Sequence, residues 1–273
     1  MAIHVLLNTK GGVGKSTLSW HVMPALFTKL GKSFKIFEID NNNVTNVFHQ
    51  STIIKDNTQT VKTSDKNIAA EIIFQTMTSN DELIVDAGGG DDALKVIEIV
   101  KSIGEAKINW FIPLNRNLAQ LKNALNTYDQ INDPQNTYFI LNGYTSLEDI
   151  TDEFLFYFGN TNMNIEGIRD QLKIQREFTI PFSNYFEIAE MQNLTIADLA
   201  KISQELTKEE AKALFFEKFK DDKQAFFRAW CDYKNSEDAA QVLEQIFTDF
   251  LPFFDNGTQT EPTRAKWHKR GTL

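Results

Sequence analysis

The sequence predicts an α/β fold: a doubly wound, mostly parallel sheet with helices on both faces, followed by a C-terminal helical extension. Three observations lead to this prediction. Short apolar runs alternate with amphipathic stretches in the first part of the chain, a glycine-rich loop directly follows the first apolar run, and the last part becomes charged with helical spacing. Because alternating strands and helices connect through right-handed crossovers, their strands lie parallel in one sheet.

The strands are expected where short apolar runs end in polar residues or glycine. These runs are residues 3–8, 34–40, 82–90 with its terminal glycines, 108–114, 137–143 and 178–182. The intervening helices are expected at 15–31, 91–103, 117–131 and 147–158. Ligands of such sheets bind beyond the carboxyl ends of the strands, where Asp40, Asp86 and Asn142 fall.

Two interruptions of the alternating pattern are also expected. Pro24 lies inside the first helix, where proline removes a backbone hydrogen bond, so a kink or bulge is predicted there. Residues 41–67 are polar and rich in Asn and Thr, which predicts a long loop after the second strand.

Composition limits the classes of protein that the chain can belong to. Among 273 residues, 42% are hydrophobic and 24% charged, an ordinary globular balance, and no apolar run reaches the roughly 18 residues of a membrane span. Cys231 is the single cysteine, which excludes an internal disulfide and fits a cytoplasmic location. The net charge of −9 argues against a surface that is basic throughout.

The stretch TKGGVGKS, residues 9–16, is predicted to bind phosphate. Its glycines let the backbone curl so that N–H groups point inward, and the next helix presents its positive N-terminal end. Lys15 is expected to reach the β- and γ-phosphates, and the Ser16 hydroxyl to ligate Mg²⁺. An ordinary glycine turn is the alternative, but GKS between a strand and a helix favours the phosphate loop. The expected contacts are Gly11, Gly12, Val13, Gly14, Lys15, Ser16 and Thr17.

These residues resemble the deviant Walker A motif of the ParA/MinD family of P-loop ATPases, and ParA-like partition ATPases in particular. The resemblance covers about residues 1–200. FEID resembles the second-strand motif, which implies that Asp40 orients the attacking water. LIVDAGGG resembles Walker B, which implies that Asp86 holds Mg²⁺ through water. ILNG and TIPF resemble the segments around the adenine, implying contacts from Asn142, Pro181 and Phe182.

The same resemblance gives a role to Lys10, which lies inside the loop where Thr9 replaces the usual first glycine. It implies that Lys10 crosses a homodimer interface to the phosphates of the other subunit, and that Lys10, Lys15 and Asp40 serve ATP hydrolysis with Mg²⁺. A cation at the transferring phosphoryl group stabilises the charge on its oxygens. The alternative is that Lys10 is a solvated loop residue.

The sequence departs from the family pattern after the second strand. Asn41, Asn42 and Asn43 follow Asp40 where Asp-Pro-Gln is usual, and Glu38 takes the place of a common aspartate. The glycine run at 88–90 has two interpretations: a switch segment that responds to the γ-phosphate, or a tight turn capped by Asp91.

The last part of the chain is expected to add helices to the ATPase domain. Residues 1–200 are predicted to form that domain, 201–255 a helical extension packed on it, and 256–273 a flexible basic tail. Thr207 and Glu210 are spaced as a capping box, and Ser236 is a candidate N-cap for a further helix. Residues 242–254 are apolar and acidic, so no membrane attachment is expected.

Three functions fit this sequence. The first is a ParA-like partition switch whose ATP-bound dimer binds nonspecific DNA and is released by a stimulating partner protein. The second is a ParA-like ATPase of a conjugation or secretion apparatus, recruited through aromatic residues of the helical region 205–254. The third is a small-molecule ligase of the dethiobiotin-synthetase kind, against which Lys10 argues. Basic tail residues either contact DNA phosphates or are simply solvated: Arg264, Lys266, Lys269 and Arg270.

Overall fold

The computed structural model describes residues 2–39, 50–62, 71–72, 74, 78–103, 106–172, 174 and 176–256. Asp40, the three asparagines that follow it and the basic tail lie outside these residues, as does most of the predicted loop at 41–67.

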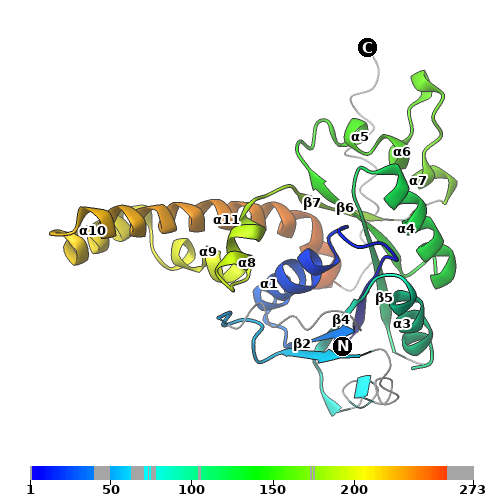
Figure 1. The fold of residues 1–273 in the computed structure, drawn as a ribbon, viewed down its shortest axis with the longest axis horizontal. Helices are drawn as coiled ribbons and strands as arrows, with labels where there is room; N and C mark the ends of the chain where they lie inside the picture. The colour runs from blue at the N-terminus through cyan, green and yellow to red at the C-terminus, as the bar shows by residue number, and fades with distance from the viewer. Residues whose placement is uncertain are drawn as a thin grey trace.

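The core of the fold is a seven-stranded sheet in the order β3-β2-β4-β1-β5-β6-β7, with every neighbouring pair parallel (Figure 1). The strands are β1 Ile3–Leu6, β2 Phe34–Ile39, β3 Thr58–Val61, β4 Glu82–Ala87, β5 Ile108–Leu114, β6 Thr137–Tyr144 and β7 Glu177–Pro181. The predicted parallel α/β fold is therefore confirmed. The expected loop at 41–67 is wrong in one respect, because the edge strand β3 lies within it.

Helices cover both faces of the sheet, and the last two extend beyond it (Figure 1). They are a π-helical turn at Thr17–Val22, α1 Met23–Lys29, α3 Asp91–Lys101, α4 Leu118–Ile131, α5 Ile150–Glu153, α6 Leu155–Phe158, a 3-10 turn at Thr161–Met163, α7 Ile168–Gln171, α8 Tyr185–Met191, α9 Ile196–Glu205, α10 Lys208–Phe219 and α11 Lys223–Asn256. The bulge expected at Pro24 is present, since the π-helical turn ends directly before α1 and places Pro24 in its first turn, where proline is tolerated.

Alternation along the strands builds two cores, one on each face of the sheet. In β4, for example, Ile84 faces one core, whereas Leu83 and Val85 face the other. Because both faces are covered by helices, both sets of side chains are apolar, as expected of a buried parallel sheet.

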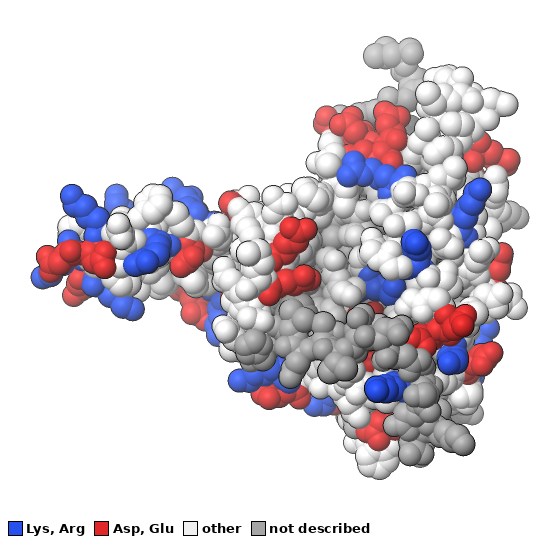
Figure 2. All heavy atoms as spheres, in the orientation of Figure 1, with Lys and Arg blue, Asp and Glu red and all other residues white. Residues whose placement is uncertain are grey.

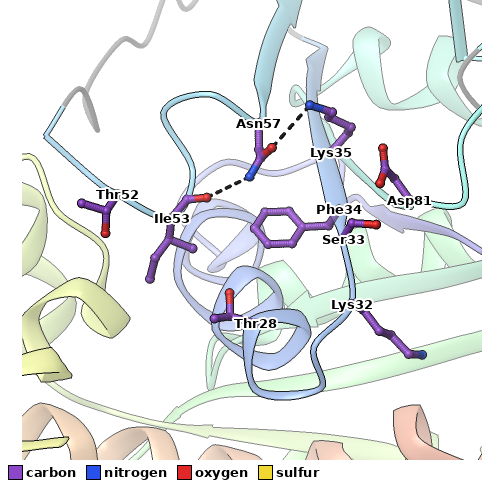
Figure 3. A pocket seen from close by; sticks show the side chains of 9 residues that line it. All are labelled: Thr28, Lys32, Ser33, Phe34, Lys35, Thr52, Ile53, Asn57 and Asp81. Carbon is purple, nitrogen blue, oxygen red and sulfur yellow. Dashed lines mark hydrogen bonds between the residues drawn. The ribbon is translucent and has the colours of Figure 1, made fainter. Parts of the chain in front are cut away.

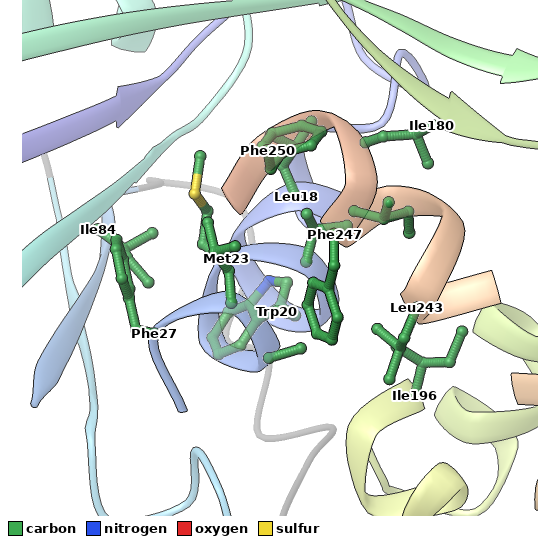
Figure 4. Close-up of a cluster of buried hydrophobic side chains, with 14 of the residues drawn as sticks. Leu18, Trp20, Met23, Phe27, Ile84, Ile180, Ile196, Leu243, Phe247 and Phe250 are labelled. Carbon is green, nitrogen blue, oxygen red and sulfur yellow. The ribbon is translucent and has the colours of Figure 1, made fainter. Parts of the chain in front are cut away.

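The C-terminal half of α11 completes one of these cores (Figure 4). Leu243, Phe247 and Phe250 of α11 pack with Trp20 and Met23 of the first helical segment, which consists of the π-helical turn and α1. The apolar stretch at 242–254 thus contributes to the core shared with the sheet. The predicted division of the chain at residue 200 stays a prediction, and α9 runs continuously across it.

Two local predictions for the helical region had opposite outcomes. The capping box of Thr207 and Glu210 begins α10, with the reciprocal hydrogen bonds of that motif. Ser236 is not an N-cap. It is buried in the interior of α11, where its Oγ accepts a hydrogen bond from the Ser203 backbone N–H at 2.9 Å, so its hydroxyl joins α11 to α9.

A buried polar cluster ties the amino end of the sheet to α11. Glu82 accepts hydrogen bonds from the Ala2 backbone N–H at 2.7 Å and from Lys32 at 3.2 Å, and its Oε2 lies 3.1 Å from His4 Nε2. Lys32 also donates to the Phe254 carbonyl at 3.2 Å. Burial opposes ionisation of Glu82, but its hydrogen bonds and the nearby cationic groups lower its pKa to about 2. Burial lowers the pKa of His4.

Replacing Glu82 by Gln is expected to destabilise the protein above pH 4.5 and to matter progressively less as the pH falls toward 2. The folded-state pKa of Glu82 lies below its ordinary 4.5, so its ionised form stabilises the fold, and that contribution is lost on protonation. At about 1.4 kcal/mol for each pH unit across this window, the difference in unfolding free energy approaches about 3 kcal/mol at pH 7.

Urea denaturation of both proteins at several pH values between 2 and 7 measures this difference. The matched control is Glu244→Gln, because the Lys29–Glu244 pair is solvent-exposed at 3.5 Å and contributes less than about 1 kcal/mol. A Glu82→Gln effect that does not change between pH 2.5 and pH 7 would contradict the assignment.

Candidate nucleotide-binding site

The glycine loop lies between β1 and the first helical segment, at the carboxyl ends of the strands. Gly12 and Gly14 have φ angles of +71° and +104°, conformations that side-chain-bearing residues rarely adopt. Gly11 and Gly12 are exposed, whereas Val13 is buried and anchors the loop against the body of the protein. The loop therefore has the curled, partly exposed backbone that phosphate binding requires.

Asn8, which the sequence analysis did not single out, holds the base of this loop. Its Nδ2 donates to the Pro113 carbonyl on β5 at 2.9 Å, and its Oδ1 accepts from the Lys10 backbone N–H at 3.0 Å. On the neighbouring residue, the Thr9 N–H donates to Thr127 Oγ1 on α4 at 3.4 Å. Asn8 is fully buried, so both ends of its amide are used for positioning the loop.

The two lysines of the loop are placed differently. The Lys15 ammonium folds back across the loop and donates to the carbonyls of Asn8, at 3.3 Å, and Lys10, at 3.2 Å. Lys10 is exposed, and its backbone rather than its side chain provides its hydrogen bonds within the described part of the chain. The Lys15 ammonium is thus bonded to the loop backbone, whereas Lys10 is exposed to solvent.

Asp86 lies beside the first helical segment, where its side chain bonds to Ser19 and not to Ser16. Parallel register pairs Asp86 with Leu6, the last residue of β1. Its Oδ2 accepts a hydrogen bond from Ser19 Oγ at 2.5 Å, and both side chains are buried. Ser16 is exposed. Ser19 Oγ also lies 3.3 Å from the Ser16 carbonyl, but Ser19 is buried and its contact with Asp86 is tertiary, so no local pattern in the sequence identifies it.

Asn142 packs directly against the loop. Its Nδ2 donates to the Val13 carbonyl at 3.1 Å, and a Cβ added to Gly14 would lie only 2.2 Å from that nitrogen. The structure therefore brings Asn142 to the predicted phosphate loop. Pro181 is buried at the end of the adjacent strand β7, and Phe182 follows it with its side chain exposed.

The glycine run at 88–90 contacts the same loop. The Gly90 N–H donates to the Thr9 carbonyl at 2.8 Å, and Gly90 has a φ of +62°. Asp91 does not cap α3 as one interpretation expected: Gly90 is the N-cap residue, no side-chain cap is formed, and Asp91 is the first residue of the helix. A segment that follows the Asp86 strand is thus hydrogen-bonded to the glycine loop.

This donor set fits a magnesium-bound phosphate chain. Backbone N–H groups of a glycine loop and a lysine ammonium favour anionic oxygens. The Ser16 hydroxyl at the start of the helix and the Asp86 carboxylate on β4 are the kinds of oxygen ligand, direct or through water, that Mg²⁺ prefers.

A separate cavity of about 520 Å³ lies at the opposite edge of the sheet (Figure 3). It surrounds Phe34, the first residue of β2, and is therefore at the amino ends of the strands. Asn57 lines the cavity. Its side chain donates to the Ile53 carbonyl at 3.0 Å and accepts from Lys35 Nζ at 3.4 Å. The cavity is therefore not part of the glycine-loop site, which lies at the carboxyl ends of the strands.

Residues 4–246 match the model of the CobQ/CobB/MinD/ParA nucleotide binding domain. The chain belongs to this family of nucleotide-binding ATPases. Its P-loop fold and the glycine loop after β1 agree with that membership.

Several solved structures are similar in fold. They include the MinC:MinD cell division protein complex of Aquifex aeolicus, at 19% identity over 72% of this chain and 88% of that chain with a TM-score of 0.49. A nucleotide-binding protein from Archaeoglobus fulgidus in complex with ADP is 17% identical over 70% and 86%, with a TM-score of 0.44. The McdA–ATP complex of Cyanothece is 13% identical over 73% and 90%, with a TM-score of 0.42. A search of curated proteins found no match.

Among the described residues, no helix has the length and apolar character needed to cross a membrane.

Replacing Gly14 by Ala is expected to destabilise the protein by at least about 2 kcal/mol. The φ of +104° is strained for alanine, and the new Cβ would collide with the Asn142 amide. Gly11→Ala is the matched control, because its Cβ would meet nothing within 4 Å and its φ is not in the left-handed region. Thermal unfolding without nucleotide measures both, and equal effects would contradict this geometry.

Proposed function

We propose that this protein is an ATP-dependent dimerising switch of the ParA type. The observation that supports this function best is the placement of the two loop lysines. The Lys15 ammonium is bonded to the backbone of the glycine loop, close to where phosphates would bind, and Lys10 of the same loop is exposed to solvent. One bound nucleotide can then receive a cation from its own subunit and another from a second subunit.

The remaining residues are assigned roles around this arrangement. Gly11, Gly12 and Gly14 supply backbone N–H groups to the phosphates, and Lys15 leaves its two carbonyl partners to bind the β- and γ-oxygens. Ser16 ligates Mg²⁺, and Asp86 holds it through water. Val13 and Thr17 complete the phosphate loop.

The base is assigned to the edge of the sheet formed by β6 and β7. Asn142 uses one N–H for Val13, which leaves its second N–H and its Oδ1 for the edge of the adenine. Pro181 and Phe182 pack along the base, where the exposed Phe182 ring offers an apolar face.

Hydrolysis is assigned to Asp40, which lies outside the described residues and follows β2. It orients the attacking water, while Lys10 of the second subunit stabilises the charge that develops on the γ-phosphate. Asp40→Ala is therefore expected to leave ATP binding intact and to trap the ATP-bound dimer.

The dimer is proposed to hold nonspecific DNA or another track, with a partner protein that stimulates hydrolysis and release, as in partition of a plasmid or chromosome. A second candidate is recruitment to a conjugation or secretion apparatus through protein partners, and the exposed aromatic side chains of α10 and α11 favour it. ATP-dependent retention on DNA supports the first, and its absence favours the second. No observation favours a small-molecule ligase.

Lys15→Ala is expected to weaken ATP binding by at least about a hundredfold, because it removes the cation closest to the phosphates. Titration calorimetry with Mg-ATP measures the affinity. Lys29→Ala is the control, since that lysine is on the surface of α1 and pairs with Glu244. Unchanged affinity in the Lys15 variant would contradict the site.

Lys10→Ala is expected to keep the ATP affinity within about threefold and to lose the ATP-dependent dimer. Sedimentation velocity with a non-hydrolysable ATP analogue separates monomer from dimer. If the variant dimerises as well as the parent protein, Lys10 does not act across the interface.

A further inference from the structure

The arm, which comprises α10 and residues 223–235 of α11, carries two unusually exposed aromatic side chains. Its helices project away from the sheet (Figure 1). Phe216 on α10 is 67% exposed, and Phe227 on α11 is 66% exposed. Large apolar groups left in solvent in this way are typical of protein interfaces.

Helix geometry places these two rings on the same side of the arm. Phe215 of α10 lies 6.5 Å, between ring centroids, from Tyr233 of α11, so both residues are on the faces where the two helices meet. Phe226 is partly buried and seven residues before Tyr233, which places it on the same face of α11. Phe216 follows Phe215, and Phe227 follows Phe226, so each exposed ring is rotated by about 100° from the contact face of its own helix. Because the two helices run antiparallel, these rotations bring both rings to one side, which we call the Phe216–Phe227 face.

The charges on this face are mainly positive. Lys212, Lys220 and Lys223 lie within about two turns of the two rings on that side by the same helical spacing. In the described part of the chain they form no ion pair. Glu209 is the acidic residue on this side of α10. Over the arm as a whole, basic and acidic groups are interspersed (Figure 2).

These charges discriminate between possible occupants. A second copy using the same face would bring lysines against lysines, because a two-fold interface pairs a patch with itself. An anionic membrane surface would attract those lysines but repel Glu217, Asp221 and Asp222 at and near the tip of the arm. A protein segment that carries both apolar and acidic side chains can pack on the two rings and pair with the lysines.

We propose that the Phe216–Phe227 face docks a short amphipathic helix of a partner protein, one whose apolar side chains are flanked by Asp or Glu. The two phenylalanines serve as apolar anchors, and Lys212, Lys220 and Lys223 pair with the acidic flanks. Among the described elements α10 packs mainly against α11, so this docking is separate from the nucleotide chemistry of the glycine loop.

Selection from a phage-displayed library of helical peptides, with the full chain immobilised, tests this proposal. The selected peptides are expected to combine Leu, Ile or Phe with Asp or Glu. Their affinity is expected to fall at least tenfold for the Phe216→Ser, Phe227→Ser double variant and less than twofold for Leu214→Ser. Leu214 is the matched control, because it is 47% exposed on the opposite side of α10.

Charge reversal provides a second readout on the same peptides. Replacing Lys212, Lys220 and Lys223 by Glu is expected to weaken the acidic peptides at least tenfold, with circular dichroism confirming that the helices remain folded. Selection that enriches no peptide, or enriches basic ones, would overturn the proposal. So would peptides that bind the double phenylalanine variant as tightly as the parent chain.

The other occupants are tested with the same double variant. Sedimentation without nucleotide and flotation with phosphatidylglycerol vesicles are each expected to show no difference from the parent chain. Loss of self-association in the variant would assign the face to a second copy, and loss of vesicle binding would assign it to a membrane. Either result would refute the docking of an acidic helix.

Discussion

The glycine-loop site of this protein depends on how the backbone between β1 and the first helical segment is held. Three side chains hold this loop by hydrogen bonds to its backbone. They are Asn8 just after β1, Thr127 on α4 and Asn142 on β6. The Lys15 ammonium completes the arrangement by bonding two carbonyls of the loop. A loop that is already held in one conformation reduces the ordering cost of binding a ligand.

The parallel sheet explains why residues far apart in sequence contribute to this region. Leu6, Asp86 and Glu38 are in register on three neighbouring strands, so whatever follows them lies at the same edge. The same principle puts Asn142 and Pro181 near the carboxyl ends of adjacent strands, and Asn142 contacts the loop. By contrast, the cavity at Phe34 is at the amino ends of the strands, away from the glycine loop.

Much of this arrangement could be predicted from sequence, because buried parallel strands are continuous apolar runs and the glycine loop has a specific pattern. β3 was missed since Thr58–Val61 is a polar edge strand that pairs only with β2 and has no apolar periodicity. Ser236 was misjudged because a buried serine inside a long helix has the same local sequence as a helix start. The contacts of Asn8 and Ser19 are tertiary, with residues 113 and 86, and no local pattern encodes them.

The most direct measurement is a crystal structure with Mg²⁺ and a non-hydrolysable ATP analogue. We expect Lys15 Nζ to leave the carbonyls of Asn8 and Lys10 for the β- and γ-phosphates of its own subunit. We also expect a face-to-face dimer in which Lys10 contacts the nucleotide of the opposite protomer. A nucleotide bound away from the glycine loop, or a lone protomer whose Lys10 side chain points into solvent, would contradict these expectations.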